Sequence, residues 1–207
     1  MQILLCFRGS IQQYLQEILD PDRHRLDSCP QCDAKCPLMA HGFYSRTLVD
    51  AGFDGSIPVR RYLCCLCKRT VSLLPEFALP YLRSSVSVIG LFLTARLLEG
   101  RTLQEAAAAA SQPAMHYQRG QFWIRRFQKQ AAALCVAMVA LTAVLPAPDF
   151  PTRALRMLAA IGWIAAHRFL FAELRVHLLG WPPSLVPDGR RRLRPAPKLP
   201  HTPFVCL

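Results

Sequence analysis

Two kinds of hydrophobic periodicity divide the chain into a β-rich part and a helical part. Between residues 41 and 74, short apolar runs alternate with polar residues and with the turn signal Asp54-Gly55, a pattern typical of strands. Three strands are expected there, at residues 41–48, 57–63 and 70–74. From residue 86 onward, apolar residues recur at helical spacing. The pattern therefore predicts an α+β fold, in which a small three-stranded β-ribbon at residues 28–75 precedes a mostly α-helical region.

The first 27 residues form a segment ahead of the ribbon. Residues 1–6 are apolar enough for a short buried strand. A helix is expected over residues 10–19, because its apolar residues recur every three or four positions and Ser10 is a suitable N-cap. Asp20-Pro21 ends that helix, and we expect the segment to pack against the ribbon.

Three helices are expected within residues 86–130, and the first covers residues 86–98. Thr102 and Glu105 form a capping-box pattern that opens a short alanine-rich helix over residues 106–110. The third helix covers residues 114–130, and its inner face is expected to consist of Met115, Phe122, Trp123 and Phe127. This succession predicts a helix-turn-helix unit whose third helix is basic.

The apolar residues after position 130 predict a helical hairpin over residues 131–180. Its two helices, at residues 131–145 and 152–179, are separated by Pro146-Ala147-Pro148. The hairpin either closes the core or forms a homodimer interface. The apolar run of residues 131–145 is shorter than the roughly 20 residues that span a bilayer, so membrane association is only an alternative interpretation. Residues 181–207 are rich in proline and arginine and are expected to be a disordered tail.

The composition narrows the choice of partner and compartment. The 207 residues include 25 Lys+Arg and 13 Asp+Glu, a formal net charge of +12, which favours a phosphate-bearing partner such as DNA. The N-terminus lacks the basic and long apolar regions of a secretory signal. A cytoplasmic location is therefore expected, and the nine cysteines are interpreted as thiols and metal ligands rather than as disulfides.

Two Cys-x-x-Cys pairs carry the clearest chemical signal. Cys29 and Cys32 form the first pair, and Cys64 and Cys67 form the second. Each tight turn can place two thiolates on one side of a tetrahedral Zn²⁺, so this spacing predicts one structural zinc ion bound by all four cysteines. Cys36 and Cys65 lie beside the pairs and are interpreted as ordinary small residues. Two alternatives stay open: Cys36 could replace Cys29 in a Cys-x3-Cys version, and His41 is another nearby donor.

Basic and amide side chains concentrate in two places. In a helix-turn-helix complex, residues near the start of the third helix reach base edges while later cations hold phosphates. The alternative for this helix is a solvated basic face in an ordinary bundle, and Gly120 within it costs about 1 kcal/mol relative to alanine. The residues predicted to bind DNA are Arg60, Arg61, Lys68 and Arg69 around the second cysteine pair, and His116, Gln118, Arg119, Arg125, Arg126 and Lys129 on the helix.

These motifs resemble a known family. The relevant segments are Cys29-Pro30-x-Cys32, His41-Gly42-x-Tyr44-x-Arg46, Val59-Arg60-Arg61-Tyr62-x-Cys64-x-x-Cys67 and Trp123-Ile124-Arg125-Arg126-Phe127. Together they resemble the N-terminal zinc-ribbon and helix-turn-helix part of bacterial insertion-sequence transposases, and look closest to stand-alone bacterial proteins of unknown function that keep this part alone. The resemblance implies cysteine-bound zinc and DNA binding, with a role in regulating or assisting a mobile element.

The sequence argues against catalysis. A transposase of this kind needs three separated carboxylates that hold two metal ions, whereas the acids after residue 130 are only Asp149, Glu173 and Asp188. We therefore expect no enzymatic activity and identify no small-molecule substrate. A thiol redox protein that uses one Cys-x-x-Cys pair is the alternative from another class, and it would need a cysteine at a helix N-terminus.

Overall fold

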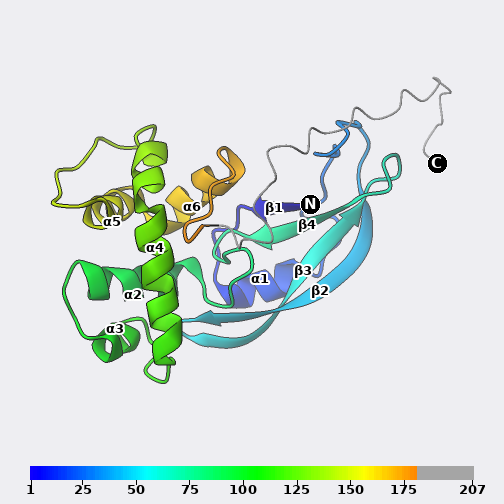
Figure 1. Cartoon of the computed structure of the whole chain (residues 1–207). Coiled ribbons are helices and arrows are strands. Elements are labelled where there is room, and N and C mark those ends of the chain that lie inside the picture. The colour runs from blue at the N-terminus through cyan, green and yellow to red at the C-terminus, as the bar shows by residue number, and fades with distance from the viewer. Residues whose placement is uncertain (181–207) are drawn as a thin grey trace.

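The computed structural model describes residues 1–180 and has an α+β architecture (Figure 1). One mixed sheet holds the four cysteines of the predicted metal site at one end, and the helices that follow residue 85 gather at the other end of the molecule. The predicted tail at residues 181–207 lies outside the described residues. The elements in chain order are β1 (Gln2–Leu5), α1 (Ile11–Glu17), β2 (Met39–Asp50), β3 (Phe53–Leu63), β4 (Thr70–Pro75), α2 (Val86–Leu97), α3 (Leu103–Ala109), α4 (Tyr117–Met138), α5 (Phe150–Ile161) and α6 (Trp163–Ala172).

The sheet contains the three predicted ribbon strands and a fourth. The strand order is β1-β4-β3-β2. The β2–β3 and β3–β4 pairs are antiparallel, and the β1–β4 pair is parallel. Gln2 pairs with Ser72 and Leu5 with Pro75, so the N-terminal strand completes the edge of the ribbon. The prediction of a three-stranded ribbon is therefore wrong by one strand. The local pattern of residues 1–6 indicated a strand, but it carried no signal for a partner about 70 positions away.

Helix α1 packs on the sheet as expected. Ser10 is its N-cap, and Ser10 and Gln13 form a reciprocal capping box that satisfies two backbone N–H groups. Tyr14 is fully buried, and its hydroxyl donates a hydrogen bond to the carbonyl of Pro58 in β3. Phe7 and Phe77 meet the Tyr14 ring edge to face, each with ring centroids 5.5 Å apart. These contacts fix the N-terminal segment against one face of the sheet.

Helices α2, α3 and α4 form the predicted three-helix unit around a shared apolar core. Thr102 and Glu105 make the expected capping box at the start of α3. Trp123 and Phe127 of α4 are buried as predicted, whereas Phe122 is 41% exposed, so its assignment to the inner face is wrong. Residues 110–116 connect α3 to α4, a longer connection than the three or four residues of simple helix-turn-helix proteins.

The predicted hairpin over residues 131–180 is replaced by a different arrangement. Helix α4 does not stop near residue 130, because Ala131, Leu134 and Met138 continue its buried stripe. The chain after the proline-containing loop breaks at Gly162, whose φ of 90° is unfavourable for residues with a side chain, and α5 and α6 are bent by 102° relative to one another. The second half of α4 therefore packs against α5, and α6 reaches back toward the sheet.

No single helix within residues 1–180 has the length and apolar character needed to cross a membrane. Helices α5 and α6 are long and apolar enough only when they are taken together, and the sharp bend at Gly162 lies between them.

Gly120 is explained by the close approach of α4 to α2. It is buried, and a Cβ atom built on it would lie 2.8 Å from Cζ of the Phe92 ring. Phe92 is itself fully buried and packs edge to face on Trp123 at 5.3 Å. The ring therefore has little room to move aside, and glycine is needed at this crossing despite its low helix propensity.

We expect Gly120→Val to destabilise the protein by about 2 kcal/mol, because the added methyl groups overpack the core. Urea unfolding followed by circular dichroism measures the change. Gly52→Val is the matched control: a Cβ atom at Gly52 meets no atom within 4 Å, so this change should stay within about 0.5 kcal/mol of the parent. Equal stability of the two variants would contradict the proposed close approach.

The segment between β4 and α2 is tied to both halves of the molecule. The Arg46 guanidinium of β2 donates to the carbonyls of Leu79 and Leu82. His177, after α6, makes a 3.0 Å hydrogen bond from Nε2 to the carbonyl of Pro80, while its Nδ1 accepts from the backbone N–H of Leu179. The sheet and the helices are therefore joined by hydrogen bonds as well as by the short connecting chain.

Two buried histidines make the fold sensitive to acid. Burial lowers the pKa of His167 to about 3, and burial together with Arg126 and Arg46 lowers that of His177 to about 4. The unfolded chain takes up protons at these rings below about pH 6.5, whereas the folded chain does not. The stability that depends on these neutral rings is therefore fully present above about pH 6.5. The unfolding free energy falls as the pH drops toward 4, by about 2 kcal/mol per histidine at pH 5.

The variant His167→Leu tests this pH dependence. The difference in unfolding free energy between pH 7 and pH 5 should shrink by about 2 kcal/mol in the variant, as measured by urea titration at both pH values. Any loss of metal ligation at pH 5 affects parent and variant alike. An unchanged difference between the two pH values would show that His167 is not held neutral.

Candidate metal centre

The two Cys-x-x-Cys turns have the same backbone geometry. In the first, the N–H of Asp33 donates to the Cys29 carbonyl, and in the second the N–H of Lys68 donates to the Cys64 carbonyl, at 2.9 and 3.0 Å. Asp33 and Lys68, which follow the second cysteine of each pair, have φ values of 55° and 56°. After the left-handed residue the chain folds back, and the N–H of Cys29 donates to the Ala34 carbonyl and that of Cys64 to the Arg69 carbonyl, each at 3.0 Å. The second turn lies in the β3–β4 connection, and the first precedes β2.

The four sulfurs converge on one point. The Sγ atoms of Cys29 and Cys67 are 3.8 Å apart, and those of Cys32 and Cys64 are 3.7 Å apart. All four lie within 4.8 Å of one another. Metal–sulfur bonds of about 2.3 Å would place the sulfurs of a regular tetrahedron about 3.8 Å apart. Both contacts join the two turns, so the donor set and its spacing fit a single four-coordinate metal ion.

The pKa values of the clustered cysteine thiols also favour the binding of a metal cation. Burial raises the pKa of the Cys64 thiol, but the backbone N–H groups of Cys67 and Leu66, together with the thiols of Cys29 and Cys67, lower it to about 7. Desolvation and the three neighbouring thiols raise the pKa of Cys32 to about 12. Four thiolates therefore cannot coexist at neutral pH by themselves. A divalent metal ion that displaces the protons would supply the missing positive charge.

The core around the cluster is small. Cys29 and Cys64 are buried, Cys67 is half-buried and Cys32 is exposed. The Tyr62 hydroxyl of β3 donates a hydrogen bond to the carbonyl of Pro21, which joins the loop between α1 and β2 to β3. Because so little apolar surface surrounds the two turns, a bound metal would contribute directly to the folding of this end of the sheet. The buried residues of this cluster are Cys29, Leu38, Tyr62, Cys64, Val71 and Leu73.

The neighbouring donors do not join the four sulfurs. Cys36 does not replace Cys29, because Cys29 occupies the site together with Cys32. His41 is exposed on β2 and is not part of the cluster. Cys36 and Cys65 lie against one another instead, with their Sγ atoms 3.5 Å apart. The sequence interpretation of Cys36 and Cys65 as ordinary small residues missed this contact.

Two of the predicted DNA-binding arginines have internal roles. Arg60 is 5% exposed, and its guanidinium donates to the carbonyls of Ile18 and Leu19 while lying 3.9 Å from the Phe43 ring centroid. Arg126 donates through Nε to the Leu179 carbonyl at 2.7 Å and through Nη2 to Gly180. Both side chains bind backbone carbonyls and stabilise loops, which conflicts with the prediction that they hold DNA phosphates.

The remaining predicted residues lie in two separate places. Lys68 and Arg69 are exposed at the second turn, where Arg61 is half-buried and donates to the Thr70 hydroxyl. On α4 and the residue before it, His116, Gln118, Arg125 and Lys129 are exposed, and Arg119 is half-buried.

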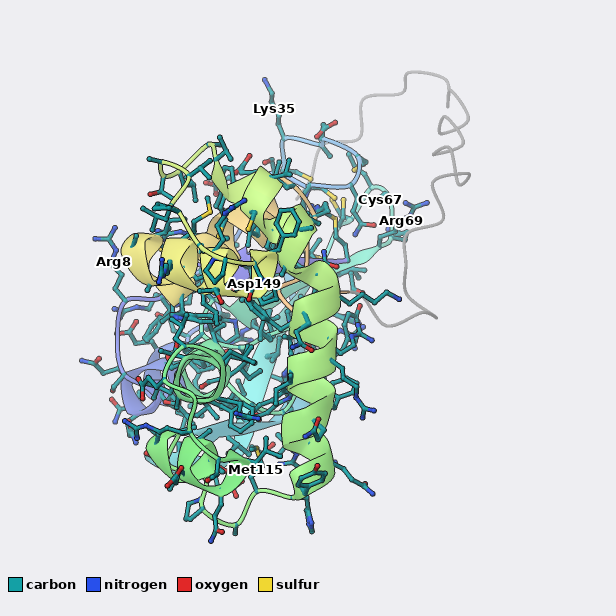
Figure 2. The ribbon with its side chains drawn as sticks, turned by 60° about the vertical axis from the view of Figure 1, so that its left-hand side comes forward. Arg8, Lys35, Cys67, Arg69, Met115 and Asp149 are labelled. Atoms are coloured by element: carbon teal, nitrogen blue, oxygen red, sulfur yellow. The ribbon has the colours of Figure 1, made fainter. Side chains whose placement is uncertain are left out.

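The cysteine turns and the start of α4 lie at opposite ends of the molecule. Strand β3 begins near the helices and ends at the second turn, a length of about 33 Å. Figure 2 likewise places Cys67 and Arg69 together at one end and Met115, just before α4, at the other. The structure therefore does not bring the two groups of cations together. The metal centre lies at the far end of the sheet and does not contact α4.

Part of the chain is similar to a known family. Residues 29–116 match the model of a domain of unknown function (DUF6431), which is less than half of the 207 residues. The match begins at Cys29, includes all four clustered cysteines, and ends just before α4. It is not a match to a transposase family. The comparisons with curated proteins and with solved structures give no match.

Proposed function

We propose that this protein binds DNA through α4 and contains one structural zinc ion. The observation that supports DNA binding most directly is the charge of α4. This 22-residue helix contains no aspartate or glutamate, and its exposed side carries Arg125 and Lys129. Such uncompensated positive charge on a regular helix suits the phosphate backbone of duplex DNA.

Zinc is the metal that the donor set favours. Four thiolates are soft ligands, which bind Zn²⁺ well and are poor ligands for Mg²⁺ or Ca²⁺. All four tetrahedral positions are filled by protein sulfurs, as in structural rather than catalytic zinc sites. Zinc would hold the first turn against the β3–β4 connection. The role of the zinc ion would be to stabilise the sheet against which the helices pack.

The start of α4 is the part that we assign to base contacts. His116, Tyr117 and Gln118 are exposed there, and glutamine can hydrogen-bond adenine in the major groove. Arg125 and Lys129 follow two and three turns later and would bind phosphates. The cations at the second cysteine turn, Lys68 and Arg69, are far from α4 and would meet a different stretch of backbone.

The thiol redox alternative has less support. Its reactive cysteine would lie at a helix N-terminus, whereas both Cys-x-x-Cys pairs lie in turns and face each other across a distance suited to a metal. For the biological role we propose a DNA-binding accessory or regulator of a mobile element, without a catalytic domain of its own. This part of the proposal rests on the motifs that resemble transposases.

A salt titration tests the DNA-binding proposal. Binding of the metal-loaded full chain to a labelled duplex should weaken steeply between about 50 and 200 mM salt, because each neutralised phosphate releases counterions. The logarithm of the binding constant should fall linearly with the logarithm of the salt concentration. Binding that is absent at low salt, or that does not change with salt, would reject the proposal.

A further inference from the structure

A second pair of cysteines lies beside the metal centre. Cys36 belongs to the loop between the first turn and β2, and Cys65 is inside the second turn, between two of the metal-binding positions. Both are half-buried, and their Sγ atoms are 3.5 Å apart. The two residues are 29 positions apart in sequence, so their contact is produced by the same folding that brings the four other sulfurs together.

We propose that Cys36 and Cys65 form a peroxide-sensitive modification site that closes to a disulfide. The Cys36–Cys65 contact requires a sulfur movement of about 1.5 Å to reach the disulfide bond length of about 2.05 Å. Because each residue lies in a loop and not within a strand, the movement can be made by side-chain rotation and small loop shifts.

The chemistry is that of two thiols and a hydroperoxide. One thiol gives up its proton, and its sulfur attacks a peroxide oxygen and breaks the O–O bond. This step forms a sulfenic acid and, when the peroxide is hydrogen peroxide, releases one water. The second sulfur then attacks the sulfenic sulfur, forms the S–S bond and releases a second water. Two thiols and one hydrogen peroxide thus give one disulfide and two waters. The sulfurs are oxidised and the peroxide is reduced.

This pair is chemically distinct from the four metal-site cysteines. Metal binding would occupy the sulfurs of Cys29, Cys32, Cys64 and Cys67. Cys36 and Cys65 are not members of that cluster, and their sulfurs contact one another. The disulfide would connect the same two loops as the metal. It would therefore hold the two turns together after the metal is removed, because the covalent link restricts the unfolded chain.

The test uses the zinc-loaded full chain and hydrogen peroxide. We expect the intact mass to fall by the two hydrogens of one disulfide, with the zinc content unchanged. Trypsin should release the Cys36 fragment, residues 36–46, joined to residues 62–68, which contain Cys65. The variants Cys36→Ser and Cys65→Ser should each abolish this link, whereas Cys6→Ser, which removes an exposed thiol elsewhere, should leave it intact.

Three results would overturn the proposal. A joined fragment that persists in Cys65→Ser would show that a metal-site cysteine is the true partner. Zinc release before disulfide formation would show that the four-sulfur site is the more readily oxidised one. Zinc loss from unoxidised Cys36→Ser or Cys65→Ser would show that the pair serves the metal and not oxidation.

Discussion

Replacing Cys64 by serine is expected to remove the metal and unfold the sheet end of the protein. Cys64 is fully buried and belongs to the cross-turn contact with Cys32. Structural zinc sites contribute about 10–16 kcal/mol of apparent binding free energy, which is comparable to the whole stability of a typical domain. The small core around Tyr62 cannot replace that contribution. Bound zinc, measured by elemental analysis, should fall from one per chain to near zero, and hydrogen exchange should accelerate in β3 and β4.

Cys36→Ser is the matched control for this change. It alters a cysteine in the same region that lies outside the four-sulfur cluster, so it should keep one zinc and native exchange rates. Chelation of the parent protein should reproduce the Cys64→Ser result. A Cys64→Ser protein that retains a full zinc complement and slow exchange would contradict the assignment of Cys64 as a ligand.

The double variant Arg125→Ala/Lys129→Ala is expected to lose most DNA affinity while keeping its fold. Both side chains are exposed on α4, so their removal leaves the core intact. Each lost phosphate contact lowers the salt slope by about 0.9 and affinity at 0.1 M salt by about tenfold. The double variant should therefore bind about 100-fold more weakly, with a slope shallower by about 2. Fluorescence anisotropy with a labelled duplex measures both quantities.

A charge-matched control separates this local effect from net charge. Arg8→Ala/Arg23→Ala also removes two cations, from the α1 side of the molecule, where Arg23 pairs with Glu17. Figure 2 shows Arg8 pointing away from α4. This control should bind DNA almost as tightly as the parent. Equal losses in the two double variants would mean that α4 is not the DNA-binding face.

Features that depend on neighbouring residues were predictable from the sequence. The cap residues Ser10 and Thr102 marked helix starts that the structure confirms, because capping is a local interaction. The doubled Cys-x-x-Cys spacing indicated which sulfurs would meet, since each turn fixes two of them. The alternation in β2 and β3 located those strands to within a few residues.

Features that depend on distant contacts were not predictable in this way. The burial of Arg60 follows from the carbonyls of Ile18 and Leu19, which are about 40 positions away. The Cys36–Cys65 contact depends on both turns being in place at once. In the sequence, Gly120 is a residue of low helix propensity within a helix. The reason for a glycine there is the nearby Phe92 ring, which leaves no room for a Cβ atom. In each case the deciding interaction joins residues whose proximity no local pattern encodes.

X-ray absorption at the zinc edge of the purified full chain tests the central claim most directly. A single zinc bound by Cys29, Cys32, Cys64 and Cys67 predicts four sulfur scatterers at about 2.3 Å and no nitrogen or oxygen in the first shell. Nitrogen or oxygen scatterers at about 2.0–2.1 Å in place of any sulfur, or a protein that folds normally without retaining zinc, would contradict it.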